Sequence, residues 1–540
     1  MATFSIRLIS KHIADAWLTA SVHVDAFRAE PGAYLTAVKW RVKRKRVRAQ
    51  AQFARLLALS PKAYTLWAMR QDHGRGAVTH SEDASPILAL IDGVGEYRAA
   101  DLNMTCDSLR REGIAALIIG SAETPTLADA AATINQAGDA WLFPLKPGDT
   151  VSPGMAGAYY SVMKDYRGHV IYADDDVISG HRRISPYFKP DWNAELFQHW
   201  DYLTGSCILR GSRDDLDVAG ETPDWASTLA RRLVDKGNPF HLCQMLHHRR
   251  KRPVPQIPAQ PLVIERTLPP VSVVVPTRNR VDLLRTCLVG VEAAAYPDVE
   301  VIVMDNDSDD PETLAFLEGL SPTRYRVVRY GGPFNYSAIN NRGVELARGR
   351  LICLLNNDVE MSDTCWLATL ATQALRPEIG AVGARLLYPD GRIQHAGVVI
   401  GVGNAAGHAH RFLRPDEEGY FHHHNLPQFT MAVTAACLVV EREKFVAVGG
   451  LNAVDFPVAF NDVDLCLRLN QRGWQSLYEP RATLIHHESV SRGFDKDPVG
   501  AARFEAELAA LKRIWKTDEV YDPYHHPQLS RASEQFAVAL

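Results

Sequence analysis

The chain reads VSVVVPTRNR at 271–280, VEVIVMDND at 299–307, YRVVRY at 325–330 and RLICLLNND at 350–358. Each apolar run is the length of a strand, and the intervening segments 281–295, 311–320 and 336–348 read as helices. Continuous apolar strands that alternate with helices predict a parallel sheet covered on both faces. Ligands bind such sheets at the carboxyl ends of the strands, so the residues after each run are the candidates for chemistry.

Polar clusters follow three of the four runs. They are Thr277-Arg278-Asn279, Asp305-Asn306-Asp307 and Asn356-Asn357-Asp358. A single cluster of this kind more often caps the next helix or makes an Asx turn. Three clusters at successive strand ends converge on one rim of a parallel sheet, which favours a binding site there.

Two later segments add ionisable side chains to this candidate site. FNDVDLCLRLNQRGW (460–474) opens an amphipathic stretch with Asp462 and Asp464, and LIHHES (484–489) ends an apolar run at His486. The two carboxylates could simply favour the positive end of a helix, or Asp462 could act as a general base. A neutral His486 imidazole could join Asp358 on a divalent cation, or could be a hydrogen-bonded histidine at a strand end.

These segments resemble the family 2 glycosyltransferases, which have the GT-A fold. The resemblance rests on PPVSVVVPTRNR (269–280), the acidic end of the second strand, LLNNDVE (354–360), FNDVDLCLRLNQRGW and HHESVSRG (486–493). It implies that Asn356-Asn357-Asp358 occupies the place of the family's DXD motif, with Asp358 as the remaining metal-binding carboxylate. Because Asn356 replaces the first Asp, fewer charges would hold the cation.

The resemblance also implies roles for the other candidate residues. Asp462 matches the catalytic base, and His486 matches a histidine that helps to bind metal or diphosphate. The residues implied for donor binding are Pro276, Thr277, Asn279, Asp305, Asn306, Asp307, Asn356 and Asn357. Those assigned to the acceptor side are His395, Asn461 and Asp464.

The implied activity is an inverting hexosyl transfer in bacterial surface-polysaccharide or O-antigen synthesis. The donor would be a UDP-, dTDP- or GDP-sugar, the acceptor a glycan or lipid-linked glycan, and the cofactor Mn²⁺ or Mg²⁺. The cation would neutralise the diphosphate leaving group while Asp462 takes the proton of the acceptor hydroxyl.

Other motifs in the C-terminal half are weaker indications of function. DNDSDD (305–310) begins like a calcium loop but lacks the Gly and Glu that the loop requires. Gly401 to Ala406 matches a loose dinucleotide pattern without a clear helix after it. The histidine-rich stretch 387–430 invites a metal interpretation, but its irregular polar sequence favours an acceptor-binding loop region over the site.

The sequence predicts five parts. Residues 1–80 read as a helical, partly basic segment, 86–250 as a second GT-A-like module, 251–267 as a Pro-rich linker, 268–520 as the catalytic domain and 521–540 as a tail. In the second module Lys146 stands where the metal-binding acid is expected, so we predict that this module is degenerate and inactive. We interpret Asp174 to Asp176 as a capped turn there.

Composition and charge indicate where in the cell the protein is expected and which partners it is expected to contact. The net charge of −4 and 46% hydrophobic content are those of an ordinary globular protein, without an apolar run long enough to span a membrane. Eight scattered cysteines and the lack of a recognisable signal peptide favour a reduced, cytoplasmic protein without structural zinc. The basic run KWRVKRKRVR (39–48) suits either a solvated helix or contact with anionic lipid at the inner membrane face. Nothing else in the chain supports nucleic-acid binding.

Three alternatives stay open at this point. Both modules could be active and add two sugars in sequence. The chain could instead be a non-catalytic nucleotide-sugar-binding or scaffold protein of a polysaccharide assembly, although the set of Asp358, Asp462 and His486 argues against this. A nicotinamide-dependent oxidoreductase would rest on the 401–406 pattern alone.

Overall fold

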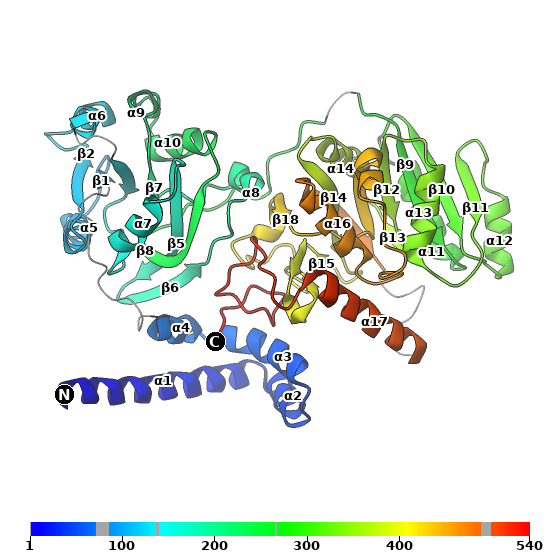
Figure 1. The fold of residues 1–540 in the computed structure, drawn as a ribbon, viewed down its shortest axis with the longest axis horizontal. Coiled ribbons are helices and arrows are strands. Elements are labelled where there is room, and N and C mark those ends of the chain that lie inside the picture. Colours follow the sequence, from blue (N-terminus) through cyan, green and yellow to red (C-terminus); the bar gives the residue numbers. More distant parts are fainter. Residues whose placement is uncertain (1, 72–85, 137–139, 265–266, 488–497) are drawn as a thin grey trace.

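The computed structural model describes residues 2–71, 86–136, 140–264, 267–487 and 498–540. Two α/β modules lie side by side, and a group of N-terminal helices lies along one side of the pair (Figure 1). Residues 251–264, within the predicted linker, contain no helix or strand.

The C-terminal module is built on one large mixed sheet. Its strand order is β11 (Tyr325–Arg329), β10 (Val299–Asp305), β9 (Val271–Thr277), β12 (Leu351–Leu355), β19 (Cys437–Glu441), β14 (Ile379–Leu387), β20 (Gln475–His486) and β13 (Val359–Glu360). The first four strands are parallel, as the apolar runs predicted, and β19 then enters antiparallel between β12 and β14. The parallel strands therefore direct the ends of β9 and β12 to one rim.

Alternate side chains of these strands enter two separate cores. Val273 and Val275 of β9 pack in the core with the helices α11 and α14, whereas Val274 packs in the core with α13 and α16. This double burial explains why the strands read as continuous apolar runs. The helices of the module are α11 (Val281–Glu292), α12 (Pro311–Glu318), α13 (Tyr336–Leu346), α14 (Trp366–Ala374), α15 (Arg442–Ala447), α16 (Asn461–Gln471) and α17 (Pro498–Trp515). The first three confirm the predicted helices and end two or three residues earlier.

Along the main path of its sheet the N-terminal module has the same strand order with one strand fewer, and β18 (Gln428–Thr430), which pairs with β20 off that path, also has no described counterpart. Its sheet runs β2 (Ala115–Ile119), β1 (Ile87–Asp92), β3 (Trp141–Leu145), β7 (Cys207–Leu209), β5 (Val170–Ser179), β8 (Phe240–Arg249) and β4 (Thr150–Val151). Position by position this order corresponds to β10-β9-β12-β19-β14-β20-β13, and among the described residues β11 has no counterpart. In each module a further strand pairs with the fifth of these seven positions: β6 (Arg182–Tyr187) with β5, and β15 (Ile393–His395) with β14. This correspondence is what the predicted second copy of the C-terminal fold requires.

Helices cover the N-terminal sheet as well. They are α5 (Ala99–Arg111), α6 (Leu127–Gln136), α7 (Met155–Met163), α8 (Ala194–His199), α9 (Arg213–Gly220) and α10 (Trp225–Val234). The interpretation of Asp174 to Asp176 as a capped turn was wrong. All three residues lie on strand β5 and are buried. Side-chain cations and imidazoles in contact with these carboxylates make their burial in a strand possible.

Four helices precede the first sheet. They are α1 (Ala2–Ala29), α2 (Pro31–Val42), α3 (Arg46–Ala58) and α4 (Ala63–Gln71). Helix α4 is held firmly on the N-terminal module, where the Trp67 ring lies 4.8 Å from that of Phe188 and the Tyr64 hydroxyl donates to Asp176. The basic run 39–48 covers the end of α2 and the start of α3, and residues 41–48 are all exposed. None of the described helices combines the length and the apolar character that a membrane crossing requires.

The predicted tail is folded against the rest of the protein. After α17 the chain returns to the N-terminal module, where Trp67 Nε1 donates to Gln528 at 3.0 Å and Asp191 N donates to the carbonyl of Pro523 at 2.7 Å. Figure 1 shows this red segment between the two modules. The segment also contacts the C-terminal module, where His410 N donates to the carbonyl of Glu534 at 2.8 Å, so it touches both halves.

Candidate active site

A cavity of about 860 Å³ opens at the predicted rim, beside the ends of β9 and β12 and the start of α16. It is lined by Pro276, Thr277, Arg278, Asn279, Arg280, Phe334, Tyr336, Asn356, Asn357, Asp358, Gln394, Val398, Ala406, Gly407, His408, Thr434, Ala435, Ala436, Val458, Ala459, Phe460, Asn461, Asp462, Val463, His486, Arg503 and Phe504. The structure thus brings together nine residues predicted from the sequence: Pro276, Thr277, Asn279, Asn356, Asn357, Asp358, Asn461, Asp462 and His486.

The turn after β9 is stabilised by its own polar side chains. Asn279 adopts a left-handed conformation (φ 54°), and its side-chain oxygen accepts from the backbone N–H groups of Asp309 and Asp310, at 3.0 Å each. Thr277 Oγ1 accepts from Asn357 Nδ2 at 3.0 Å, which joins the ends of β9 and β12. These contacts hold one wall of the cavity in place.

The predicted cluster after β10 lies outside the cavity lining. Asp305 is buried and accepts from Ser308 N at 3.1 Å, and Asn306 donates to the carbonyls of Tyr330 and Gly332. Asp307 forms an ion pair with Arg329. All three side chains support the loops behind the cavity wall.

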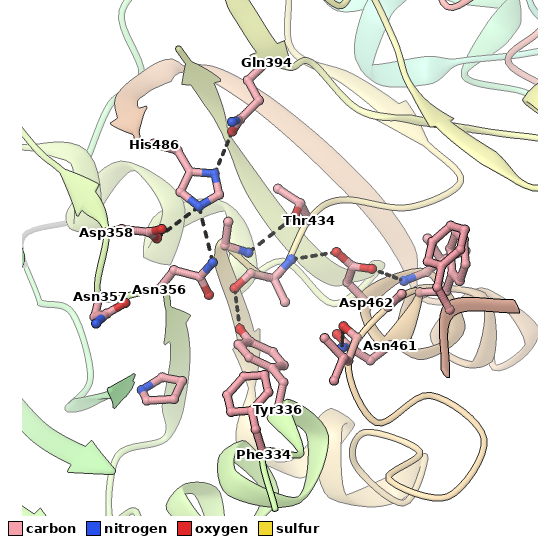
Figure 2. A pocket seen from close by; sticks show the side chains of 18 of the residues that line it. Phe334, Tyr336, Asn356, Asn357, Asp358, Gln394, Thr434, Asn461, Asp462 and His486 are labelled. Atoms are coloured by element: carbon pink, nitrogen blue, oxygen red, sulfur yellow. Dashed lines mark hydrogen bonds and ion pairs between the residues drawn. The ribbon is translucent and has the colours of Figure 1, made fainter. Parts of the chain in front are cut away.

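Asp358 and His486 form the pair predicted to bind the cation (Figure 2). His486 ends β20 and lies opposite Val359 of β13, so the register brings its Nε2 to 3.1 Å from Asp358 Oδ1. Gln394 Oε1 lies 2.6 Å from His486 Nδ1, and Asn356 Nδ2 lies 3.3 Å from Nε2. A proton on Nδ1, donated to Gln394, leaves the Nε2 lone pair directed at the carboxylate.

This arrangement suits a divalent cation. The Asp358 carboxylate oxygen and the His486 Nε2 atom face each other at 3.1 Å, so they can share either a proton or a divalent cation. A carbonyl-type oxygen behind a ligating histidine is also the common way to fix its tautomer. Asp358 and His486 therefore fit a cation such as Mn²⁺ or Mg²⁺, although Asn356 contributes no charge.

Asp462 lies on the other side of the Thr434–Ala435 segment from that pair (Figure 2). It occupies the first turn of α16, where Oδ2 accepts from Ala435 N at 3.1 Å and Oδ1 from its neighbour Val463 N at 2.8 Å. Burial raises the pKa of the Asp462 carboxyl, and these backbone donors oppose the rise only in part. A carboxylate with a raised pKa at the edge of an open cavity can accept a proton more readily than an exposed one.

The three residues predicted for the acceptor side lie differently. Asn461 lines the cavity but donates its amide to the carbonyl of Val458 at 2.6 Å. His395 is fully buried behind the cavity, with Nδ1 at 2.9 Å from His408 Nδ1. Asp464 lies outside the lining, where Arg468 and the Trp515 indole hold its carboxylate.

The stretch 387–430 contains more regular secondary structure than the predicted loop region, and part of it lies away from the cavity. It contains β15, β16 (Val398–Ile400), β17 (Ala406–His408) and β18 (Gln428–Thr430), and of its histidines only His408 reaches the cavity. Burial lowers the pKa of His408 to about 3, so this ring is neutral. His423 lies at the contact with the N-terminal module, where it hydrogen-bonds the Tyr187 hydroxyl at 2.9 Å.

The glycines at 401–406 have a packing role. A Cβ on Gly401 would lie 2.2 Å from the Arg531 guanidinium, so the missing side chain makes room for the C-terminal segment. Only a three-residue 3₁₀ turn (Val402–Asn404) follows, which removes the basis for a dinucleotide site.

Sequence reasoning missed several parts of the lining, among them Val458 to Phe460 before α16 and Arg503 and Phe504 of α17. Phe334 and Tyr336 follow β11, the third of the four apolar runs, so the rule that sites lie at strand ends also points to them. Thr434 to Ala436 precede β19, an antiparallel strand with no polar signal in its sequence.

In the N-terminal module, internal cations occupy the region equivalent to this site. Asp149 precedes β4 as Asp358 precedes β13, but it accepts from the backbone N–H groups of Arg250 and Lys146. Lys189 and Arg252 contact the Asp175 carboxylate at 2.6 and 2.5 Å. Burial opposes the charge of Asp175, but the neighbouring cations outweigh it and hold its pKa below the ordinary value.

The sheet order and the cavity at its rim define a GT-A fold, the fold of nucleotide-sugar transferases. Residues 272–424, within the C-terminal module, match the model of glycosyl transferase family 2.

Curated relatives extend the likeness into the N-terminal half. An uncharacterized protein, y4gI, of Sinorhizobium fredii is 36% identical over 419 residues (68% of this chain, 46% of the relative). The O-antigen biosynthesis protein RfbC of Myxococcus xanthus is 34% identical over 433 residues (71% and 33%). An N-acetylglucosaminyl-diphospho-decaprenol L-rhamnosyltransferase of Mycobacterium tuberculosis is 28% identical over 233 residues (39% and 74%). The chain thus spans less than half the length of the first two relatives.

Proposed function

We propose that this chain is an inverting, cation-assisted glycosyltransferase of cell-surface polysaccharide synthesis. It would transfer a sugar from a nucleotide-diphosphate donor to a glycan or lipid-linked glycan. The observation that supports this most is the placement of Asp358–His486 and Asp462 around one cavity of a family 2 domain. A leaving-group site and a base on different sides of the reacting carbon suit a single displacement.

The donor would lie along the β9 and β12 ends. Thr277, Asn279 and Asn357 would contact the nucleotide, and Asp358 and His486 would hold the cation. When bound, that cation supplies positive charge to the departing diphosphate. Gln394 contributes indirectly because it holds the His486 ring with Nε2 toward Asp358.

Asp462 would deprotonate the acceptor hydroxyl. The acceptor oxygen forms its bond to the anomeric carbon as the bond from that carbon to the diphosphate oxygen breaks, and the hydroxyl proton passes to the Asp462 carboxylate. Attack opposite to the leaving group inverts the anomeric centre. The raised pKa of Asp462 brings the base closer to the working pH.

The N-terminal module would be non-catalytic. The buried Lys189, Arg252 and Arg249 side chains already neutralise its carboxylates, so a divalent cation would meet positive charge there. This favours a role in packing or acceptor binding over a second transferase activity. Loss of all turnover in Asp358→Ala, with full turnover in Asp176→Asn, is the expected result, and the reverse pattern would support the bifunctional alternative.

The basic run 39–48, exposed over 41–48, would contact the membrane face at which a lipid-linked acceptor lies. Its basic side chains stand beside the exposed apolar residues Leu35, Val38 and Val42 of α2. Basic and apolar side chains together favour the surface of an anionic bilayer.

The decisive experiment is a calorimetric screen of UDP-, dTDP- and GDP-sugars, with and without Mn²⁺, on the wild type and Asp358→Ala. Metal-dependent binding of one donor that the variant loses would support the proposal. Donor binding of equal affinity with and without Mn²⁺ would contradict the cation mechanism, and binding without turnover on any acceptor would favour the scaffold alternative.

A further inference from the structure

A second group of metal-ligating side chains lies far from the cavity, where the C-terminal segment meets the N-terminal sheet. His241 and Cys243 are two residues apart on β8 and so share one face of the strand. His526 comes from the returning segment. One ligand atom from each of the three lies within 4.8 Å of the others.

The spacing within this group is that of ligands around one ion. Cys243 Sγ lies 3.4 Å from His241 Nδ1. Bonds of ~2.3 Å to sulfur and ~2.0 Å to nitrogen at a tetrahedral angle place those two atoms about 3.5 Å apart. The group therefore needs little movement to close on a metal.

Carboxylates and aromatic rings hold both imidazoles in place. The His241 ring stacks on Tyr172 at 4.6 Å, and its Nε2 lies 3.2 Å from Asp174 Oδ1, which leaves Nδ1 toward Cys243 Sγ and Asp191 Oδ1. His526 stacks on Phe188, and its Nε2 lies 2.9 Å from Asp174 Oδ2. The other nitrogen of each ring is therefore occupied from behind, by Asp174 for His241, as is usual for a ligating histidine, and by the backbone N–H of Gln528 for His526.

Two buried atoms in this group make no hydrogen bond within the described part of the chain, despite their proximity. His526 Nε2 and Asp174 Oδ2 are each shielded from solvent, and their contact lacks hydrogen-bond geometry. Their residues are 2% and 1% exposed. The two atoms face each other as an ion pair, and a metal ion at His526 Nε2 would take the place of the proton that pairs them.

The geometry points to a borderline-soft divalent cation, of the Zn²⁺ type, bound by His241, Cys243 and His526. A thiolate and two imidazoles select Zn²⁺ or a similar transition metal over Mg²⁺ or Mn²⁺, which prefer oxygen ligands. Binding requires neutral imidazoles and a thiolate, so the ion replaces the protons that these side chains otherwise carry. Cys243 lines a cavity of about 330 Å³ through which the ion and a fourth, water ligand reach the site.

The site would secure the C-terminal segment at the point where it contacts both modules. Asp522 of that segment accepts from Ile400 N of β16 at 2.8 Å, and Arg531 packs against Gly401. Strands β16 and β17 line the catalytic cavity. An ion on His526 would therefore restrain the segment that supports one wall of the active site.

The test uses the full-length protein, purified without a metal-affinity tag and titrated with Zn²⁺ and with Co²⁺ as a spectroscopic probe. We expect one equivalent of Co²⁺ to give a thiolate-to-cobalt charge-transfer band and tetrahedral ligand-field bands. Cys243→Ser should abolish the charge-transfer band, and Asp174→Asn, which alters the carboxylate behind His241, should weaken affinity by about 10–100-fold. Zn²⁺ should raise Tm and protect Cys243 from alkylation.

Matched controls keep this test independent of the catalytic site. Cys106→Ser changes another half-buried thiol of the same module and should leave the cobalt spectrum intact. Asp358→Ala should leave it intact too, because that site offers no sulfur ligand. Absence of the charge-transfer band in the wild type, or alkylation of Cys243 at the same rate with and without Zn²⁺, would overturn the proposal. The alkylation readout holds even if Cys243→Ser fails to fold.

Discussion

Replacement of Asp462 by Asn is the sharpest test of the catalytic proposal. The substitution keeps the size of the side chain and one oxygen, which can still accept from either Ala435 N or Val463 N. The amide cannot take a proton, so the chemical step loses its base. Removal of a general base costs about 10²–10⁴-fold, or about 3–5 kcal/mol of transition-state stabilisation.

The pH profile separates loss of the base from loss of structure. Asp462 acts when deprotonated, so wild-type kcat/KM should rise with pH through its pKa, which burial raises above the usual Asp value. In Asp462→Asn this acidic limb should disappear from the residual rate. Donor affinity, measured by calorimetry with Mn²⁺ present, should stay within about threefold of wild type because the nucleotide does not contact this residue in the proposed mode.

A neighbouring carboxylate supplies the contrast. Asp464→Asn keeps an oxygen for the Trp515 indole but removes the charge that pairs with Arg468, so it should lower Tm while it keeps the acidic limb. Asp462→Asn turnover within about threefold of wild type, with the limb retained, would refute the assignment of the base.

Three further predictions follow from other parts of the protein. Gln394→Leu removes the acceptor behind His486 Nδ1 and should weaken Mn²⁺-dependent donor binding by about 10–100-fold, measured by calorimetry. Burial raises the pKa of Asp522 to about 7, so the folded state favours the neutral carboxyl. The wild-type Tm should therefore fall as pH rises from about 4 toward 7. Differential scanning calorimetry should show a smaller fall in Asp522→Asn. Reversal of charge at Lys43, Arg44 and Lys45 should reduce binding to anionic vesicles on the order of 100-fold or more in flotation assays, and equal binding to neutral vesicles would contradict a lipid contact.

The parallel half of the catalytic sheet could be predicted because its signal is local. Strands buried on both faces read as apolar runs, and the rule for strand ends then found Thr277, Asn357 and Asp358. The same rule failed to distinguish Asp307, whose carboxylate contacts Arg329 instead of the cavity. The position of a residue at a strand end predicts the rim of the sheet on which it lies, but not the direction in which its side chain points.

Features that depend on distant partners could not be predicted. The run Asp174 to Asp176 reads as a turn because the cations that permit its burial, Lys189 and Arg252, come from other segments. The scattered cysteines likewise gave no hint that Cys243 lies beside His526, almost three hundred residues away. Periodicity and spacing report only neighbours in the chain.

The return of the C-terminal segment has a consequence for the order of events during synthesis. Trp67 of α4 bonds to Gln528, a residue 461 positions later. Most of the chain has been synthesised before Gln528 is added, so α4 can reach its final packing only after both sheets have been made. Until then Trp67 and Phe188 are partly exposed, and the nascent chain presents an apolar surface of the kind that chaperones bind.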